Sequence, residues 1–237
     1  MNDAASLGLH RCWKNTFVND LGYLKGDKIL NEQGQIEGYE QPRVLDVAGG
    51  TGDIAFKIIE HHEQGQTNFL GNRGIKVTVC DINQSMLDVG AQRAREQGLR
   101  DTNIEFIQGN AEELPFADNT FDAYTISFGI RNVPRIEKAL SEAHRVLKQG
   151  GRLMILEFSK VDPMITPFYN FYNFNIVPLM GQVISNDRAS YDYLAQSIDK
   201  FHSQESLLNL IEEAGFKYAS FKNLNFGIVA IHSGFKL

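Results

Sequence analysis

Short runs rich in β-branched residues alternate along the middle of the chain with segments whose apolar residues recur every three or four positions. The first pattern predicts buried strands and the second predicts amphipathic helices. Strands are expected from Arg43 and at residues 75–82, 103–110, 121–129 and 152–158. Helices are expected at residues 54–62, after the capping residue Asn83, and from Pro134 to a stop at Gly150 and Gly151. This alternation predicts an α/β fold with helices on both faces of a parallel sheet.

The last part of the chain has a different pattern. A helix over residues 204–214, capped by Ser203 and ended by Gly215, precedes two adjacent strands at residues 217–226 and 227–235. Two strands in direct succession form an antiparallel hairpin, which a plain dinucleotide-binding fold lacks. We therefore expect a single domain over residues 1–237, with a Rossmann-like, seven-stranded, mostly parallel sheet that ends in this hairpin.

Residues 160–200 interrupt the alternation with the aromatic block Pro167-Phe168-Tyr169-Asn170-Phe171-Tyr172-Asn173-Phe174. These aromatic side chains are too many for an exposed loop. One interpretation is an apolar wall for a greasy substrate, which Phe168 and Tyr169 would contact; the other is a buried core or a subunit interface. The segment is therefore expected to cover the substrate or to contact a second subunit.

A glycine turn follows the first strand, in Leu45-Asp46-Val47-Ala48-Gly49-Gly50-Thr51-Gly52-Asp53. Such a turn brings backbone amides close to a nucleotide-like cofactor. Gly50, Gly52 and Ala55 also fit the dinucleotide spacing, so the glycines alone do not identify the ligand. Asp53 would repel a pyrophosphate, whereas Asp46 and Asp53 suit the ammonium and sulfonium of S-adenosylmethionine. The alternative is a tight turn with an acid-capped helix and no ligand.

Two further strands end in polar residues that suit a nucleoside. Asp81 ends the second strand, where an acid in nucleotide-binding sheets bonds ribose hydroxyls; its alternative role is to cap the next helix. Asn110 follows the third strand and offers an amide to an adenine edge, or else forms an Asx turn. Both residues are therefore candidates for cofactor binding.

The segment after the fourth strand, Ser127-Phe128-Gly129-Ile130-Arg131-Asn132-Val133-Pro134, lies where open α/β sheets place a substrate. Arg131 has no charge partner close in sequence and can hold an oxyanion, with Asn132 beside it. The alternative for Arg131 is a surface ion pair with Glu137 or Glu142.

Composition narrows the substrate and the compartment. The 237 residues carry a formal charge of −6 and no run of Lys or Arg, which argues against a nucleic-acid partner held through its phosphates. Cys12 and Cys80 are too few for a disulfide framework and are expected to be free thiols in a reducing compartment. No cluster of residues has the spacing of a metal site, so no metal is expected. A small or lipid-like substrate is favoured.

Three blocks together resemble the UbiE-type quinone-biosynthesis C-methyltransferases. They are residues 1–14 with Gly8-Leu9-His10-Arg11-Cys12-Trp13-Lys14, the glycine turn, and Ser127-Phe128-Gly129-Ile130-Arg131-Asn132-Val133. The resemblance implies a class I methyltransferase that uses S-adenosylmethionine to methylate a ring carbon of 2-methoxy-6-polyprenyl-1,4-benzoquinol in ubiquinone synthesis. By residue match, the family's cofactor positions fall on Thr51, Asp81, Asn110, Ala111 and Ser127.

Two departures from the bacterial pattern resemble a mitochondrial member. The connector at residues 64–74 is longer, and the first motif begins abruptly, as if a preceding segment had been removed. The resemblance therefore implies a location on the matrix side of the mitochondrial inner membrane, with peripheral membrane contact, or alternatively in a bacterial cytoplasm. It also implies a homodimer that works with other quinone-biosynthesis enzymes.

The chemistry follows once a quinol is assumed. A ring carbon becomes a nucleophile when the neighbouring hydroxyl loses its proton, so the site must stabilise a phenolate. Arg131 is the expected cation, and Asn132 is the group that orients the hydroxyl or a water. A guanidinium stays protonated, so Arg131 is not the proton acceptor. The sequence identifies no general base. His10 is expected in a lid over the site, although a lone His is more often structural.

Three other functions fit parts of the sequence. Demethylmenaquinol methylation is the same chemistry within the same family. An NAD-dependent oxidoreductase is favoured only by the spacing of Gly50, Gly52 and Ala55, and Asp53 counts against it. A non-enzymatic scaffold for quinone-synthesis enzymes would use the aromatic block as its interface.

Overall fold

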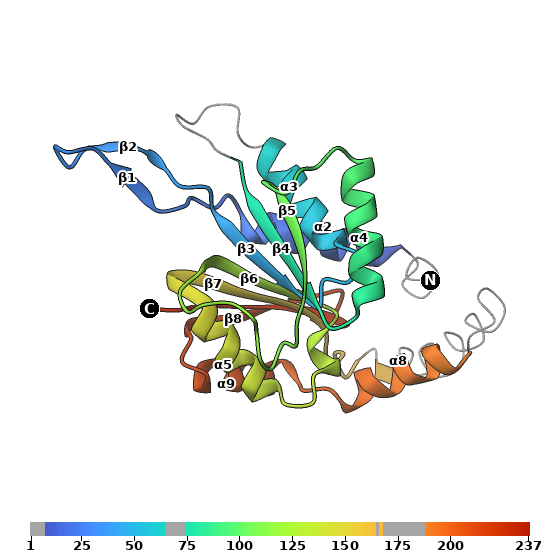
Figure 1. The fold of residues 1–237 in the computed structure, drawn as a ribbon. Coiled ribbons are helices and arrows are strands. Elements are labelled where there is room, and N and C mark those ends of the chain that lie inside the picture. Colours follow the sequence, from blue (N-terminus) through green and yellow to red (C-terminus); the bar gives the residue numbers. More distant parts are fainter. Residues whose placement is uncertain (1–7, 65–73, 165, 168–187) are drawn as a thin grey trace.

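The computed structural model describes residues 8–64, 74–164, 166–167 and 188–237. Its centre is a seven-stranded sheet in the order β5-β4-β3-β6-β7-β9-β8 (Figure 1). Strands β3 to β7 are parallel to one another, whereas β9 is antiparallel to both β7 and β8. The predicted parallel sheet with a terminal hairpin is therefore confirmed. The strands are β3 (Arg43–Val47), β4 (Lys76–Asp81), β5 (Ile104–Gln108), β6 (Phe121–Ser127), β7 (Leu147–Phe158), β8 (Lys217–Leu224) and β9 (Val229–Phe235).

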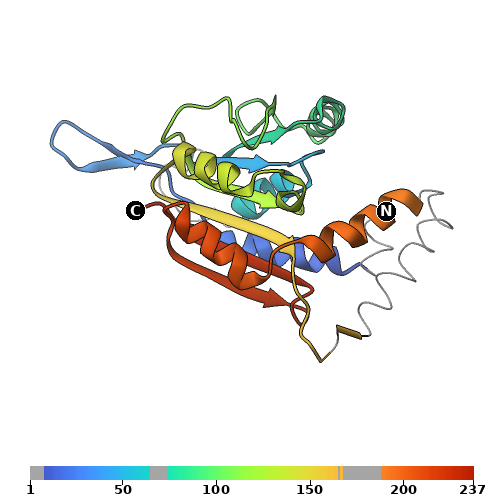
Figure 2. The ribbon, with the colours of Figure 1, turned by 90° about the horizontal axis from the view of Figure 1, so that it is seen from below.

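Helices cover both faces of this sheet (Figures 1 and 2). The alternation of β7 shows the two faces directly: Met154 and Leu156 pack in one apolar core, while Leu153 and Ile155 pack in the other. A strand buried on both faces is continuously apolar, as the stretch Leu153–Leu156 of β7 is. The first core is covered by α2 (Leu9–Leu21), α3 (Asp53–Gln64) and α4 (Gln84–Glu96), and the second by α5 (Ile136–Val146) and α9 (Gln204–Glu213).

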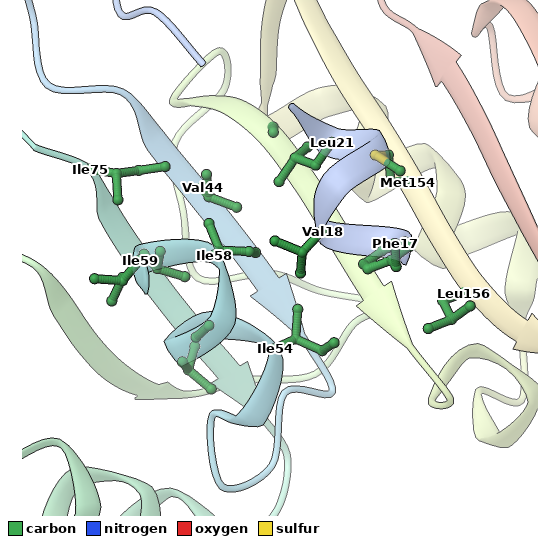
Figure 3. Close-up of a cluster of buried hydrophobic side chains, with 14 of the residues drawn as sticks. Phe17, Val18, Leu21, Val44, Ile54, Ile58, Ile59, Ile75, Met154 and Leu156 are labelled. Carbon is green, nitrogen blue, oxygen red and sulfur yellow. The ribbon is translucent and has the colours of Figure 1, made fainter. Parts of the chain in front are cut away.

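Helix α2 was not predicted from the sequence, yet it is part of the first core. Phe17, Val18 and Leu21 are buried against the sheet, beside Ile54 and Ile58 of α3 (Figure 3). Fully burying side chains of this size contributes about 1.5–3 kcal/mol each, which fixes α2 on the molecule. The N-terminal motif therefore lies close to the start of α3 and to the glycine turn before it.

The predicted boundary between α5 and β7 is wrong. The helix ends at Val146 and the strand begins at Leu147, so Gly150 and Gly151 lie inside the strand. Leu147 pairs with Phe121, and the register shifts before Arg152. A Cβ on Gly151 would lie 2.8 Å from the Lys148 carbonyl oxygen, so this irregularity requires glycine.

Two other elements lie outside the predicted pattern. The hairpin of β1 (Lys28–Leu30) and β2 (Ile36–Tyr39) forms its own two-stranded sheet and projects from the body in Figure 1. Helix α8 (Arg188–Lys200) falls within the predicted insertion and contacts the 3-10 turn η1 (Ile130–Asn132). Within the described ranges, no helix combines the length and the apolar character needed to cross a membrane.

The carboxyl ends of β3 and β6 approach each other closely. Ala48 and Phe128, the residues after these strands, have φ of 51° and 55°, a region that non-glycine residues seldom adopt. A Cβ on Gly129 would lie 2.5 Å from the Ala48 Cβ, so the two loops touch through a glycine. Backbone strain of this kind is found at functional sites, and this edge carries most of the predicted site residues.

Candidate active site

The glycine turn holds Asp81 against its backbone. Gly50 N donates to Asp81 Oδ2 at 2.9 Å, and Asn83 N donates to Asp81 Oδ1 at 2.8 Å. Gly50 and Gly52 have φ of 55° and 79°, as expected of glycines in a tight turn. The predicted convergence of the ends of β3 and β4 is therefore confirmed, and the Asp81 carboxylate lies at the turn.

Asp46 is buried beside this turn with one oxygen unsatisfied. Thr125 Oγ1 donates to Asp46 Oδ1 at 2.8 Å, whereas Oδ2 has no hydrogen-bond partner among the described residues. Burial raises the pKa of Asp46 from 3.8 to about 7, against the opposing effects of the Thr125 hydrogen bond and Lys14. A buried acceptor without a donor fits the ammonium group of an amino-acid-bearing cofactor.

Asp53 pairs with two cations. Lys14 Nζ donates to Asp53 Oδ2 at 2.6 Å, and Arg93 Nη2 lies 3.9 Å from Asp53 Oδ1. The hydrogen bond and charge of Lys14, helped by Arg93, hold the pKa of Asp53 below its usual value even though partial burial alone would raise it. Asp53 is therefore already paired, and of the two acids it is Asp46, within β3, that has an oxygen available for a cofactor ammonium.

The remaining cofactor candidates lie at the same edge of the sheet. Ser127 Oγ is buried and, like Asp46 Oδ2, has no hydrogen-bond partner among the described residues. Asn110 Oδ1 accepts from Glu112 N at 3.0 Å, so its oxygen forms the Asx turn and only its amide NH2 remains for a base. Ala111 lies within that turn, and Thr51 Oγ1 accepts from Arg93 Nη1 at 2.9 Å. The cofactor roles of these residues stay predictions.

Arg131 has a charge partner that its neighbours in sequence did not suggest. Its Nη1 donates to Glu157 Oε1 at 2.9 Å and to the Phe128 carbonyl oxygen, and Glu157 is fully buried at the end of β7. Burial raises the pKa of Glu157, while Arg131 opposes that rise. Arg131 therefore pairs with an acid 26 residues away, and the alternative of a surface pair with Glu137 or Glu142 is wrong.

Helix α8 supplies the other contacts of η1. Arg131 Nε donates to Ser197 Oγ at 3.4 Å, and the Tyr193 hydroxyl donates to Asn132 Oδ1 at 3.1 Å. Within the described part of the chain, Arg131 Nη2 makes no hydrogen bond. The guanidinium is thus fixed on one side by Glu157 and α8, and its second nitrogen is available to an oxyanion.

Aromatic rings adjoin this arginine. The ring centroids of Phe128 and Phe158 lie 5.0 Å apart, and the Trp13 ring centroid lies 6.3 and 6.2 Å from them, respectively. The Arg131 guanidinium stacks over the Phe158 ring. Trp13 Nε1 donates to Asn225 Oδ1 at 2.6 Å, which ties α2 to the terminal hairpin. The N-terminal motif therefore belongs to the site region, and His10 lies on α2 one turn before Lys14. A substrate role for His10 stays a prediction, and Phe168 and Tyr169 lie outside the described residues.

Sequence reasoning missed Glu157 and Tyr193. Glu157 carried a signal, since it is an acid directly after the apolar run Leu153–Leu156 and close to the carboxyl edge of the strand. A buried acid needs a partner, and Arg131 is a cation that follows the neighbouring strand. Tyr193 had no comparable signal, because helix α8 was not predicted.

Asp81→Ala is expected to weaken S-adenosylmethionine binding by about 1.5–3 kcal/mol, the range for hydrogen bonds to a charged group. Titration calorimetry measures the change, with Asp88→Ala as control because Asp88 on α4 only accepts from Gln84 in the exposed first turns. A dissociation constant unchanged in Asp81→Ala would remove this residue from the cofactor site.

The order and directions of the strands are those of the class I S-adenosylmethionine-dependent methyltransferase fold. The chain is similar to the crystal structure of such a methyltransferase from Aquifex aeolicus, with TM-score 0.56 and 18% identity over 83% of this chain and 82% of that one. It is also similar to the [4+2]-cyclase SpnF, with TM-score 0.60 and 21% identity over 83% of this chain and 75% of that one. Because a cyclase shares the fold, the fold alone does not establish methyl transfer.

The chain belongs to the ubiE/COQ5 methyltransferase family, whose model matches residues 1–236. It is 51% identical to the ubiquinone/menaquinone biosynthesis C-methyltransferase UbiE of Rhizobium meliloti, over 100% of this chain and 83% of the relative. It is 46% identical to the mitochondrial 2-methoxy-6-polyprenyl-1,4-benzoquinol methylase of Dictyostelium discoideum, over 100% of this chain and 77% of the relative. The predicted enzyme class is confirmed, and the oxidoreductase and scaffold alternatives lose their support.

Proposed function

We propose that this methyltransferase transfers the methyl group of S-adenosylmethionine to a ring carbon of 2-methoxy-6-polyprenyl-1,4-benzoquinol in ubiquinone biosynthesis. The observation that carries the proposal is the neighbourhood of two sets of residues at the carboxyl edge of the sheet. Asp46 and Ser127 have buried oxygens without hydrogen-bond partners among the described residues. Ser127 ends β6, and Arg131 comes four residues after it. A cofactor amino acid and a phenolate would thus be held side by side.

The residues around the glycine turn fit the cofactor. Asp46 Oδ2 would accept from its ammonium group, Asp81 from its ribose hydroxyls, and the Asn110–Ala111 turn would face its adenine. When bound, S-adenosylmethionine supplies an electrophilic methyl group on a sulfonium. The protein fixes the position of that group, and alignment with the acceptor carbon is a large part of the rate enhancement expected.

Arg131 and Asn132 would act on the quinol. The Arg131 guanidinium, held by buried Glu157, would stabilise the ring oxygen as its proton leaves, so that electron density shifts to the neighbouring carbon. Asn132, bonded to Tyr193, would orient the ring hydroxyl or a water that takes its proton. The aromatic side chains of Phe128 and Phe158 provide an apolar neighbour for the ring.

The proposal also extends to location and partners. The curated relatives include a mitochondrial protein and bacterial ones, and the longer connector at residues 64–74 favours the matrix side of the mitochondrial inner membrane over a bacterial cytoplasm. Assembly as a homodimer, contact with other quinone-biosynthesis enzymes and peripheral membrane contact are parts of the same proposal. Demethylmenaquinol is the second candidate substrate, because the Rhizobium meliloti relative is named for ubiquinone and menaquinone.

The test is methyl transfer from labelled S-adenosylmethionine to a short-tailed 2-methoxy-6-polyprenyl-1,4-benzoquinol, with demethylmenaquinol in parallel. The expected product carries the label on a ring carbon of the benzoquinol, located by mass spectrometry and NMR. Label on an oxygen would contradict C-methylation, and faster labelling of demethylmenaquinol would favour the second substrate. The Arg131→Ala variant serves as the control for non-enzymatic transfer.

A further inference from the structure

Lys14 is a buried cation whose ammonium group has more N–H donors than it has acceptors among the described residues. Its side chain is 11% exposed, and among the described residues Asp53 is its only hydrogen-bond acceptor. An ammonium group has three N–H donors, so two of them lack a protein partner here. Buried donors are normally satisfied, which indicates that Lys14 has a second acceptor when the site is filled.

The charges at the start of α3 point to the kind of acceptor. Lys14 and Arg93 both face the carboxylate of Asp53, so two cations lie at this corner. Arg93 is committed, since its Nη1 donates to Thr51 O and Oγ1 and its guanidinium stacks over Phe56. Lys14 makes no second hydrogen bond among the described residues, so its ammonium group can donate to an anion while it stays paired with Asp53.

The unsatisfied acid lies close to this unsatisfied cation. The charge of Lys14 acts on Asp46, whose Oδ2 has no partner, and both residues adjoin the glycine turn. An α-amino acid carries an ammonium and a carboxylate on the same carbon. A ligand that gives its ammonium to Asp46 therefore brings a carboxylate to within reach of Lys14.

We propose that Lys14 binds the carboxylate of the methionine part of S-adenosylmethionine, and so selects a cofactor with an intact amino-acid end. The proposal rests on the proposed function and adds a binding residue from the N-terminal helix to it. In this proposal, the packing of α2 on α3 places the Lys14 ammonium beside the glycine turn. The bland alternatives are that Lys14 only docks α2 or only neutralises Asp53.

The test compares binding of S-adenosylmethionine with binding of its decarboxylated form by titration calorimetry. The wild type is expected to prefer the intact cofactor by about tenfold or more, the range for a charge-assisted hydrogen bond. Lys14→Met keeps the buried volume and is expected to bring the two affinities within about threefold, by weakening only the intact form. Lys57→Met is the matched control, because Lys57 also joins α3 to α2, through Asn15 Oδ1 at 2.8 Å on the exposed side.

A double variant separates the alternatives. If Lys14 only neutralises Asp53, then Lys14→Met combined with Asp53→Asn restores the preference; our proposal requires that the preference stays lost. Equal weakening of both ligands in Lys14→Met would assign the residue to docking and overturn the proposal, and Lys14→Arg is expected to keep the preference. A wild type that binds both forms equally overturns this inference alone, whereas one that binds neither overturns the proposed function as well.

Discussion

Arg131→Ala is expected to lower methyl-transfer turnover by about 10² or more under saturating quinol, while cofactor affinity stays nearly unchanged. Removal of one preorganised donor to a developing oxyanion typically costs roughly 3 kcal/mol in the transition state. The guanidinium follows the end of β6 by four residues, and its Nη2 makes no hydrogen bond among the described residues. Initial rates with labelled S-adenosylmethionine and the benzoquinol measure the loss.

This substitution also affects stability, and the two effects must be separated. Truncating Arg131 leaves the buried Glu157 carboxylate unpaired, which typically costs about 3–5 kcal/mol. Arg131→Met combined with Glu157→Gln removes both charges and is expected to recover much of the melting temperature without recovering turnover. Arg131→Lys is expected to recover only part of the rate, because a point charge cannot replace a planar fork.

Arg135→Ala is the matched control. Arg135 also pairs with a buried glutamate, Glu112, and lies four residues further along the chain. It is expected to change stability and to leave turnover unchanged. Full activity of Arg131→Ala, measured alongside this control at a temperature where both are folded, would reduce Arg131 to a structural ion pair with Glu157.

The sequence predicted the fold well because the fold depends on local patterns. Each core strand is a short β-branched run, and the strand–turn–helix order leaves few ways to build the sheet. It failed at Gly150 and Gly151, where glycine serves an irregular strand as readily as a helix end. It also missed α2 and the β1–β2 hairpin, whose patterns are short and mixed.

The site was predicted only as far as it follows from the sheet. Asp46, Asp81, Ser127 and Arg131 come together because parallel strands end at one edge, and that rule needs no knowledge of side chains. The pairs of Arg131 with Glu157 and of Asp53 with Lys14 join residues 26 and 39 positions apart. No local pattern specifies such contacts, so they came from the structure alone.

Asp46→Asn is expected to weaken S-adenosylmethionine binding and at the same time to stabilise the ligand-free protein. Binding loses the charge of the acceptor for the cofactor ammonium, which corresponds to about 10–100-fold in affinity. Stability changes in the other direction because burial raises the pKa of Asp46 from 3.8 to about 7. The ionised Asp46 carboxylate therefore lowers the free energy of unfolding of the ligand-free wild type by up to about 4 kcal/mol at high pH. The variant avoids this cost but has to bury an amide, which costs about 1–3 kcal/mol.

The pH dependence gives the sign of both effects. A carboxyl group whose folded pKa is raised contributes most stability below about pH 4 and loses it as pH rises through about 7. The melting temperature of the variant should accordingly exceed that of the wild type at pH 8, by roughly 2–10 °C, and the difference should vanish near pH 4. Cofactor affinity of the wild type should fall by up to about tenfold per pH unit below pH 7, and that fall should be absent in the variant.

Asp122→Asn is the control with the opposite sign. Asp122 is also a largely buried carboxylate of the sheet, but it lies near the start of β6, at the opposite end from the site. It accepts a hydrogen bond from Arg43 N at 2.8 Å and forms an ion pair with Lys148 at 3.0 Å. The same substitution there removes a paired charge, so it is expected to lower the melting temperature at pH 8 and to leave cofactor binding unchanged. If Asp46→Asn instead lowered the melting temperature as Asp122→Asn does, and bound S-adenosylmethionine as tightly as the wild type, Asp46 would be a structural carboxylate and its unsatisfied oxygen would not be a ligand for the cofactor.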